Sequence, residues 1–144
     1  MNLADKTGPH LTSDARQAIR TEIDALERSG HWTIRGAVIM PDHLHLLANL
    51  GPSLTLSRCI ARLKSKTKEA LATSGTRWQD NYYEHRLRRH ESASNVLQYI
   101  FLNPFRAGLL QSKEKYPWFW LGNEERAWFE PRLDDGQPWA EWLR

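Results

Sequence analysis

The 144-residue sequence lacks several features that define large classes of protein. Its single cysteine, Cys59, excludes an internal disulfide and any zinc site built from several thiolates. No apolar run approaches the roughly 20 residues that a membrane helix needs, and the N-terminus lacks the basic and then apolar pattern of a secretory signal peptide. No internal repeat or low-complexity segment is present. These absences favour one soluble, intracellular globular domain.

Positive charge is concentrated in one part of the chain, although the formal net charge is only +3. Residues 58–89 carry nine Lys and Arg against three Asp and Glu, whereas residues 119–144 carry three against six. A basic middle segment is typical of a surface that binds a polyanion such as nucleic acid, because neutralised phosphates release condensed counterions. The same pattern also fits the solvated face of an ordinary helix, so composition leaves both interpretations open.

Hydrophobic spacing predicts helices and strands in alternation. Three helices are expected: residues 13–29 with Ser13 as N-cap, about twenty residues capped by Ser53, and residues 92–102, ended by Pro104. Residues 31–40 and 43–50 are expected to form an antiparallel hairpin, and residues 76–89 alternate like a further strand. Tryptophans at irregular spacing near the C-terminus are expected to seal the core: Trp118, Trp120, Trp128, Trp139 and Trp142.

Two histidines interrupt the second strand of the hairpin, in the sequence MPDHLHLL at residues 40–47. Because successive side chains of a strand point to opposite faces, His43 and His45 share one face and leave the leucines on the other. Two imidazoles can share a metal ion, but two ligands rarely suffice. Tyr99 and Asn103 are four residues apart on a predicted helix, so they lie on one helical face and offer a phenol and an amide oxygen.

These residue types fit one kind of chemistry. Imidazole and amide oxygen ligands, without a thiolate, suit Mg²⁺ or Mn²⁺ bound together with a phosphate. A metal that acts as a Lewis acid on a phosphoryl oxygen, beside a tyrosine nucleophile, describes phosphodiester cleavage through a phosphotyrosine. A His-x-His pair alone is weak evidence, since many such pairs are structural or lie on the surface.

Several motifs in one order resemble a protein family. MPDHLHLL is similar to the histidine–hydrophobe–histidine motif of HUH endonucleases, and YIFLNPFRAGLL (99–110) resembles the tyrosine helix of REP-associated tyrosine transposases. RLKSKTKEAL (62–71), WQDNYYEHRLRR (78–89) and YPW (116–118) stand in the order that this family shows. The resemblance covers about residues 31–118.

The resemblance implies a ferredoxin-like α/β fold, an antiparallel sheet with packed helices, in a catalytic domain at residues 1–118. A Trp-rich extension at residues 119–144 is expected to pack on the same domain. The family implies a cytoplasmic bacterial enzyme, associated with the nucleoid, that cuts and rejoins single-stranded DNA at hairpins of repetitive extragenic palindromes. The products are a 5′-phosphotyrosine and a free 3′-hydroxyl. Tyr99 matches the nucleophile of the family. The residues that match its ligands of Mg²⁺ or Mn²⁺ are His43, His45 and Asn103.

The basic segment would then contact the DNA backbone of the hairpin, while Trp78 or Tyr82 would stack on an unpaired base. The predicted DNA contacts are Arg58, Arg62, Lys64, Lys66, Lys68, Trp78, Arg86, Arg88 and Arg89.

The sequence departs from the family in two places. The family opens with a β-strand that lies centrally in the sheet, but only Met1 to Thr12 precede the first predicted helix. That strand is therefore expected to be missing or reduced to Asn2-Leu3, and another element or a second chain, as in a homodimer, would have to fill the gap. Asp42 stands where the family often has asparagine, and it could bring one more carboxylate near the metal.

Two other functions compete with the enzyme. One is a non-catalytic module on the same fold that binds hairpin DNA or RNA and keeps vestigial histidines. The intact set of histidines, tyrosine and asparagine speaks against it. The other is a structural zinc site, which fits less well because no closed four-ligand shell is apparent.

Overall fold

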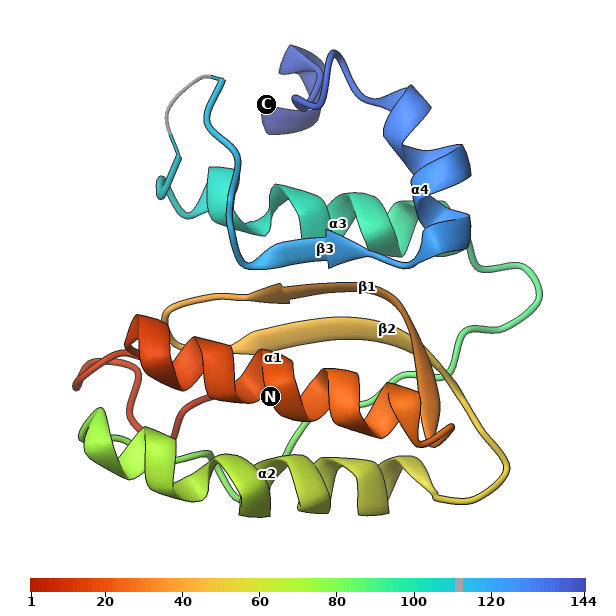
Figure 1. The fold of residues 1–144 in the computed structure, drawn as a ribbon. Helices are drawn as coiled ribbons and strands as arrows, with labels where there is room; N and C mark the ends of the chain where they lie inside the picture. Colours follow the sequence, from red (N-terminus) through yellow and green to blue (C-terminus); the bar gives the residue numbers. More distant parts are fainter. Residues whose placement is uncertain (111–112) are drawn as a thin grey trace.

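A central sheet lies between two layers of helices in the computed structural model, which describes residues 1–110 and 113–144 (Figure 1). The three strands are β1 (Trp32–Ile39), β2 (Leu44–Leu50) and β3 (Phe119–Leu121), antiparallel and in the order β2-β1-β3. Helices α1 (Ser13–Arg28) and α2 (Leu56–Thr73) cover one face, and α3 (Ala93–Arg106) covers the other with the C-terminal residues. This arrangement confirms the predicted class of an antiparallel sheet with packed helices.

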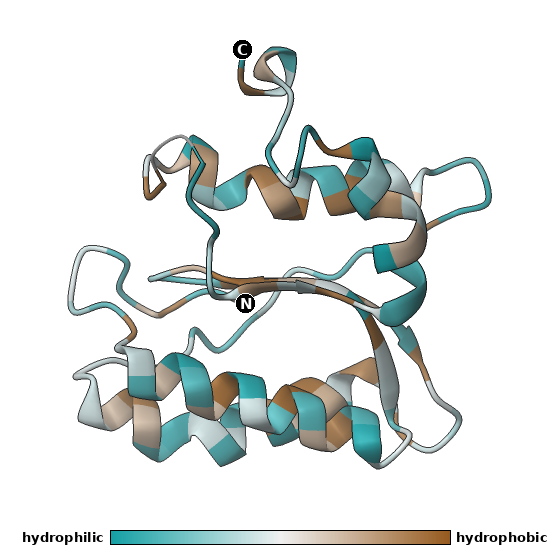
Figure 2. Cartoon of the chain, turned by 45° about the horizontal axis from the view of Figure 1, so that its top comes forward, coloured by the Kyte–Doolittle hydropathy of each residue, from teal (hydrophilic) through white to brown (hydrophobic). Residues whose placement is uncertain are grey.

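The predicted hairpin is present, and its side chains alternate as expected. Val38 pairs with His45 and Ile39 with Leu44 along the β1–β2 ladder. Leu44 is buried with the apolar faces of α1 and α2, whereas Val38 packs against Ile100 of α3. Figure 2 shows apolar residues along the strands between the two helical layers, as burial on both faces requires.

Helix boundaries differ from the prediction by a few residues. The caps are Thr12 and Thr55 rather than Ser13 and Ser53, and each accepts a hydrogen bond from a backbone N–H three residues ahead. The third helix continues through Pro104 to Arg106, so the prediction that this proline ends it was wrong. Pro104 lies in the last turn and is buried there, and Gly108, with φ of +72°, follows the C-cap.

The expected strand at residues 76–89 was also wrong. Only Trp78 forms a bridge, to Leu3, and residues 79–88 have no regular secondary structure. Alternation in this segment does not reflect burial, since Tyr83, which would share a face with Leu87, is 85% exposed, and residues 83–86 are all exposed. The segment is a long connection that leads from α2 on one face of the sheet to α3 on the other (Figure 1).

The first residues lie between His43, which precedes β2, and Trp78. Asn2 forms a bridge with His43, and Leu3 forms one with Trp78. Four backbone hydrogen bonds support the two bridges, two toward residues 42 and 44 and two toward residues 77 and 79. The predicted remnant Asn2-Leu3 is therefore present as two isolated bridges rather than a full strand.

The C-terminal extension is built into the domain. β3 starts directly after the predicted boundary at residue 118 and pairs with β1. The following helix, α4 (Asn123–Phe129), is tied to the sheet by Arg35, which donates to the buried carboxylate of Glu125 at 2.7 Å.

The tryptophans of the C-terminal region fulfil the expected packing role only in part. Trp118 and Trp120 pack on the main core, and Trp142 packs on the cluster that also holds α3. Trp128 and Trp139 are 37% and 42% exposed. In the described part of the chain, no helix is both long enough and apolar enough to span a lipid bilayer.

Candidate active site

Two imidazoles and a phenol meet on the α3 face of the sheet. The ring centroids of His43 and His45 are 4.7 Å apart, and those of His45 and Tyr99 are 5.6 Å apart, both in edge-to-face orientation. His43 directly precedes β2, His45 is the second residue of that strand, and Tyr99 comes from the middle of α3. Tyr99 is 52% exposed, so about half of the residue is open to solvent. The structure thus brings Tyr99 next to two histidines that lie 54 and 56 positions before it in the sequence.

His45 is held in its neutral form. Burial, followed by the positive charges of His43, the N-terminus and Lys6, lowers its pKa from 6.5 to about 4. A neutral imidazole has a free lone pair for a metal ion, so His45 is ready to act as a ligand at neutral pH.

His43 is paired with the preceding residue. Its Nδ1 lies 2.6 Å from Oδ1 of Asp42. Burial would raise the pKa of the Asp42 carboxyl, but the hydrogen bond and the charge of His43 outweigh it and leave that pKa below its ordinary value. Asp42 is therefore a carboxylate at neutral pH. The sequence predicted a further carboxylate near the metal at this position, but only the structure shows that it pairs with the ring of His43.

Asn103 lies one turn beyond Tyr99 on α3. Its Nδ2 donates to the backbone oxygen of Tyr99 at 3.1 Å, which leaves its Oδ1 oxygen available as a ligand. Nowhere in residues 1–110 and 113–144 do three side chains of His, Cys, Asp or Glu gather as a metal cluster. The two imidazole rings lie next to each other, and the amide oxygen of Asn103 lies one turn along α3 from Tyr99. Donors of these types suit Mg²⁺ or Mn²⁺ shared with a phosphate better than a closed zinc site.

Two of the predicted DNA contacts have partners within the protein. Lys64 donates to the backbone oxygens of Gln79 and Asp80 at 2.7 and 2.9 Å, and Arg62 lies 3.6 Å from Glu22. Both therefore have structural partners. The others with exposed side chains are Arg58, Lys66, Lys68, Arg86, Arg88 and Arg89.

Trp78 does not lie where the prediction of base stacking requires. Its ring is 7% exposed, and its indole N–H donates to Thr67 at 2.9 Å inside the main core. The indole fills the space between α2 and the N-terminal residues, so that prediction is corrected to a packing role. Tyr82 is partly buried, and the ammonium group of Lys64 lies over its ring. Tyr83 is open to solvent.

The basic connection before α3 has internal order at its end. Glu91 accepts from the backbone N–H of Arg88 at 3.1 Å, and its other oxygen lies 2.6 Å from His85. The next residue, Ser92, is the N-cap of α3. These bonds fix the last basic residues relative to the helix that carries Tyr99. No spacing in the sequence indicated this role for Glu91.

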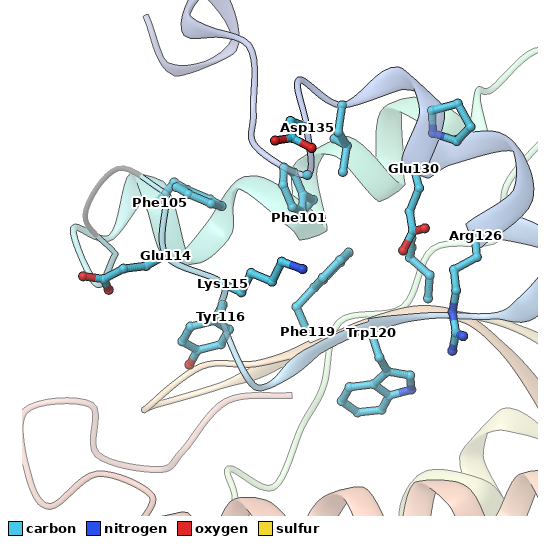
Figure 3. Close-up of a pocket in the computed structure, with 14 residues that line it drawn as sticks. Phe101, Phe105, Glu114, Lys115, Tyr116, Phe119, Trp120, Arg126, Glu130 and Asp135 are labelled. Carbon is cyan, nitrogen blue, oxygen red and sulfur yellow. The ribbon is translucent and has the colours of Figure 1, made fainter.

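A cavity of about 750 Å³ opens elsewhere, between α3, β3 and the C-terminal extension (Figure 3). Phe101, Phe105 and Phe119 line it with charged side chains of both signs. Phe101 is two residues from Tyr99, which places it about 200° around the helix axis. The cavity is thus distinct from the cluster of His43, His45 and Tyr99.

Comparisons with known proteins show the family of the chain. The family model "Transposase IS200 like" matches residues 5–102. A Haemophilus influenzae protein assigned to the REP-associated tyrosine transposases is 26% identical, with 94% of this chain and 85% of that protein covered. The REP-associated tyrosine transposase of Escherichia coli K12 is 25% identical over 81% of this chain and 70% of its own length.

A solved structure shares the fold. It shows a REP-associated tyrosine transposase bound to a REP hairpin, and it matches with a TM-score of 0.68 at 23% identity, over 82% of this chain and 71% of that one. The family model spans more than half of the chain and includes His43, His45 and Tyr99. The chain therefore belongs to the IS200-like transposase family, in agreement with its resemblance to REP-associated tyrosine transposases.

Proposed function

We propose that this protein is a metal-dependent transposase that cuts and rejoins single-stranded DNA at palindromic repeat hairpins through a 5′-phosphotyrosine. The observation that carries the proposal is the meeting of His43 and His45 with the half-exposed Tyr99 on one face of the sheet. Membership of the family supports the assignment of a transposase activity. The position of Tyr99 beside the histidines supports its role as the nucleophile.

The chemistry assigns one step to each group. The Tyr99 hydroxyl oxygen attacks the phosphorus, the bond from tyrosine to phosphorus forms, and the bond from phosphorus to the 3′-oxygen breaks. The phenolic proton is released, and the departing 3′-oxygen takes up a proton. The energy of the cut bond is kept in the phosphotyrosine, so the 3′-hydroxyl can reseal the strand without ATP. A bound Mg²⁺ or Mn²⁺ would supply Lewis acidity at the phosphate, held by His43, His45 and Asn103.

Hairpin DNA is the partner that the surface favours. Three exposed arginines, Arg86, Arg88 and Arg89, lie in the connection that leads into α3. The structural neighbour was solved with a REP hairpin bound, and this chain shares its fold. Arginine is suited to phosphate contacts, which position a duplex without reading its sequence.

The proposal is tested by trapping the covalent intermediate. Labelled single-stranded DNA pools that contain hairpins are incubated with the protein and Mn²⁺ or Mg²⁺, and a denaturing gel is examined for a protein–DNA band. We expect a band with metal, its loss in EDTA, and its loss in Tyr99→Phe, because phenylalanine has no hydroxyl to attack the phosphorus.

Tyr83→Phe is the matched control, since Tyr83 is also exposed but belongs to the basic connection and not to α3. This variant should keep the band. Retention of the band in Tyr99→Phe would refute the assigned nucleophile. Hairpin binding with no band under any metal condition would favour a non-catalytic binding module instead.

A further inference from the structure

The side chain of Asp42 contacts the ring of the neighbouring His43. Its Oδ1 lies 2.6 Å from Nδ1 of His43, and the two side chains are 27% and 15% exposed. A hydrogen bond this short between largely buried groups holds both in place. The arrangement differs from the direct metal contact that an extra carboxylate at this position first suggests.

The backbone around Asp42 is fixed from three sides. The N–H of Met40 donates to the oxygen of His43 at 2.7 Å and closes the turn between β1 and β2. Leu3 donates to the oxygen of Asp42 at 3.0 Å, and Leu11 donates to that of Pro41 at 2.8 Å. The turn is therefore anchored to the N-terminal residues, and the backbone of Asp42 and His43 is held in place.

The pairing determines which ring nitrogen of His43 can bind a metal. An ionised carboxylate only accepts hydrogen bonds, so the proton must sit on Nδ1. In the neutral ring the lone pair is then on Nε2, which is the one nitrogen left for a ligand. Carboxylates in this position orient a histidine ligand and raise its basicity, and their loss typically weakens metal binding about 10–100-fold.

We infer that Asp42 is a positioning residue that fixes the Nδ1–H tautomer of His43 and presents Nε2 to the divalent metal ion of the proposed reaction. The inference rests on the proposed function for its metal, but the tautomer is a property of the metal-free chain. The two can therefore fail separately.

The first measurement is the tautomer of His43 in the metal-free protein, read from the ring nitrogens by ¹⁵N NMR. We expect Nδ1–H in the wild type and in Asp42→Asn, because the amide oxygen of asparagine can still accept the hydrogen bond. In Asp42→Ala the acceptor is lost, and the ring should change to a mixture dominated by Nε2–H.

The second measurement is the affinity for Mn²⁺ without DNA, by titration calorimetry. We expect Asp42→Ala to bind Mn²⁺ about 10–100-fold more weakly than the wild type, with Asp42→Asn in between. Asp80→Ala removes the same charge from a carboxylate that is 95% exposed and should bind Mn²⁺ as the wild type does. The dispersion of backbone amide signals shows that each variant is folded.

The outcomes separate the two proposals. Nδ1–H retained in Asp42→Ala, or a changed tautomer with unchanged Mn²⁺ affinity, would overturn the positioning role. Wild-type protein that binds no Mn²⁺ would overturn both the proposed metal dependence and the metal-directed part of the inference. The positioning role is supported if Asp42→Ala binds Mn²⁺ more weakly than the wild type and Asp42→Asn has an intermediate affinity.

Discussion

The protonation of His45 couples the site to stability in the metal-free chain. Its pKa in the folded state is about 4, lowered first by burial and then by nearby positive charge, whereas an unfolded histidine has its ordinary value of 6.5. Between these two pH values the unfolded chain binds more protons than the folded one. Stability should therefore rise with pH across this window, and acidification from pH 6.5 toward 4 should favour unfolding.

Replacing His45 by glutamine should remove this dependence. In EDTA, the free energy of unfolding of the wild type should fall from pH 7 to pH 4.5 by about 1–2 kcal/mol more than that of His45→Gln, after allowance for partial exposure of the ring. Urea unfolding at the two pH values measures the difference. An equal fall in both proteins would show that burial does not hold His45 neutral.

Single residues also show how far the sequence was informative. The period of two in a strand was sufficient to put His43 and His45 on one face, because that period is a local property of the backbone. The burial of Trp78 was not predictable, since an indole beside basic residues fits a stacking surface as well as a core. Thr67 supplies the acceptor that makes this burial favourable, and it lies 11 positions away on α2.

At the scale of elements, the distance between α3 and the sheet depends on one glycine. A Cβ atom on Gly36 of β1 would overlap the side chain of Leu97, which is fully buried on α3. Leu97 packs with Phe101 and Leu102, so it has little freedom to move aside. A bulge in the β1–β2 pairing lies next to this glycine, between Ile34 and Gly36. The absence of a side chain here lets the helix with Tyr99 approach β1 closely.

Adding a methyl group at this position should push α3 away from the sheet. We expect Gly36→Ala to destabilise the protein by about 1–3 kcal/mol, in the range for overpacked cores, and to reduce the yield of the covalent band. In a Leu97→Ala background the methyl group has room, so its cost should fall and the two changes should be non-additive. Gly8→Ala is a control, since its Cβ would meet only the flexible end of Asp5. Fully additive costs in urea unfolding would contradict the close contact.

Helices and strands could be predicted from the sequence where buried apolar residues recur at a regular spacing, and not elsewhere. The apolar stripes of α1, α2 and α3 are buried, and spacing alone locates them. Pro104 broke the rule because it lies in the final turn, where its missing N–H removes a single hydrogen bond and its ring is buried. Residues 79–88 alternate without a partner strand, and a pattern of mostly exposed side chains contains no information on pairing.

For the whole molecule, the sequence could not show on which side of the sheet each basic residue lies. α2, with exposed Arg58, Lys66 and Lys68, covers the face opposite to α3 (Figure 1). The connection after α2 passes through Trp78, beside the residues that bridge to His43, and ends at the N-cap of α3. Arginines in the later part of this connection therefore lie closer in the fold to the helix of Tyr99 than the basic side chains of α2 do.

This placement predicts unequal contributions from two sets of three charges. Alanine at Arg86, Arg88 and Arg89 should weaken hairpin binding at least about 10-fold and lower the slope of log affinity against log salt by about 2–3, because each phosphate contact contributes roughly 0.9. Alanine at Arg58, Lys66 and Lys68 removes the same formal charge from the opposite face and should cost much less. Fluorescence anisotropy with one labelled hairpin at several salt concentrations compares the two. Equal losses would mean that the hairpin responds to total charge and not to the side of the sheet that carries Tyr99.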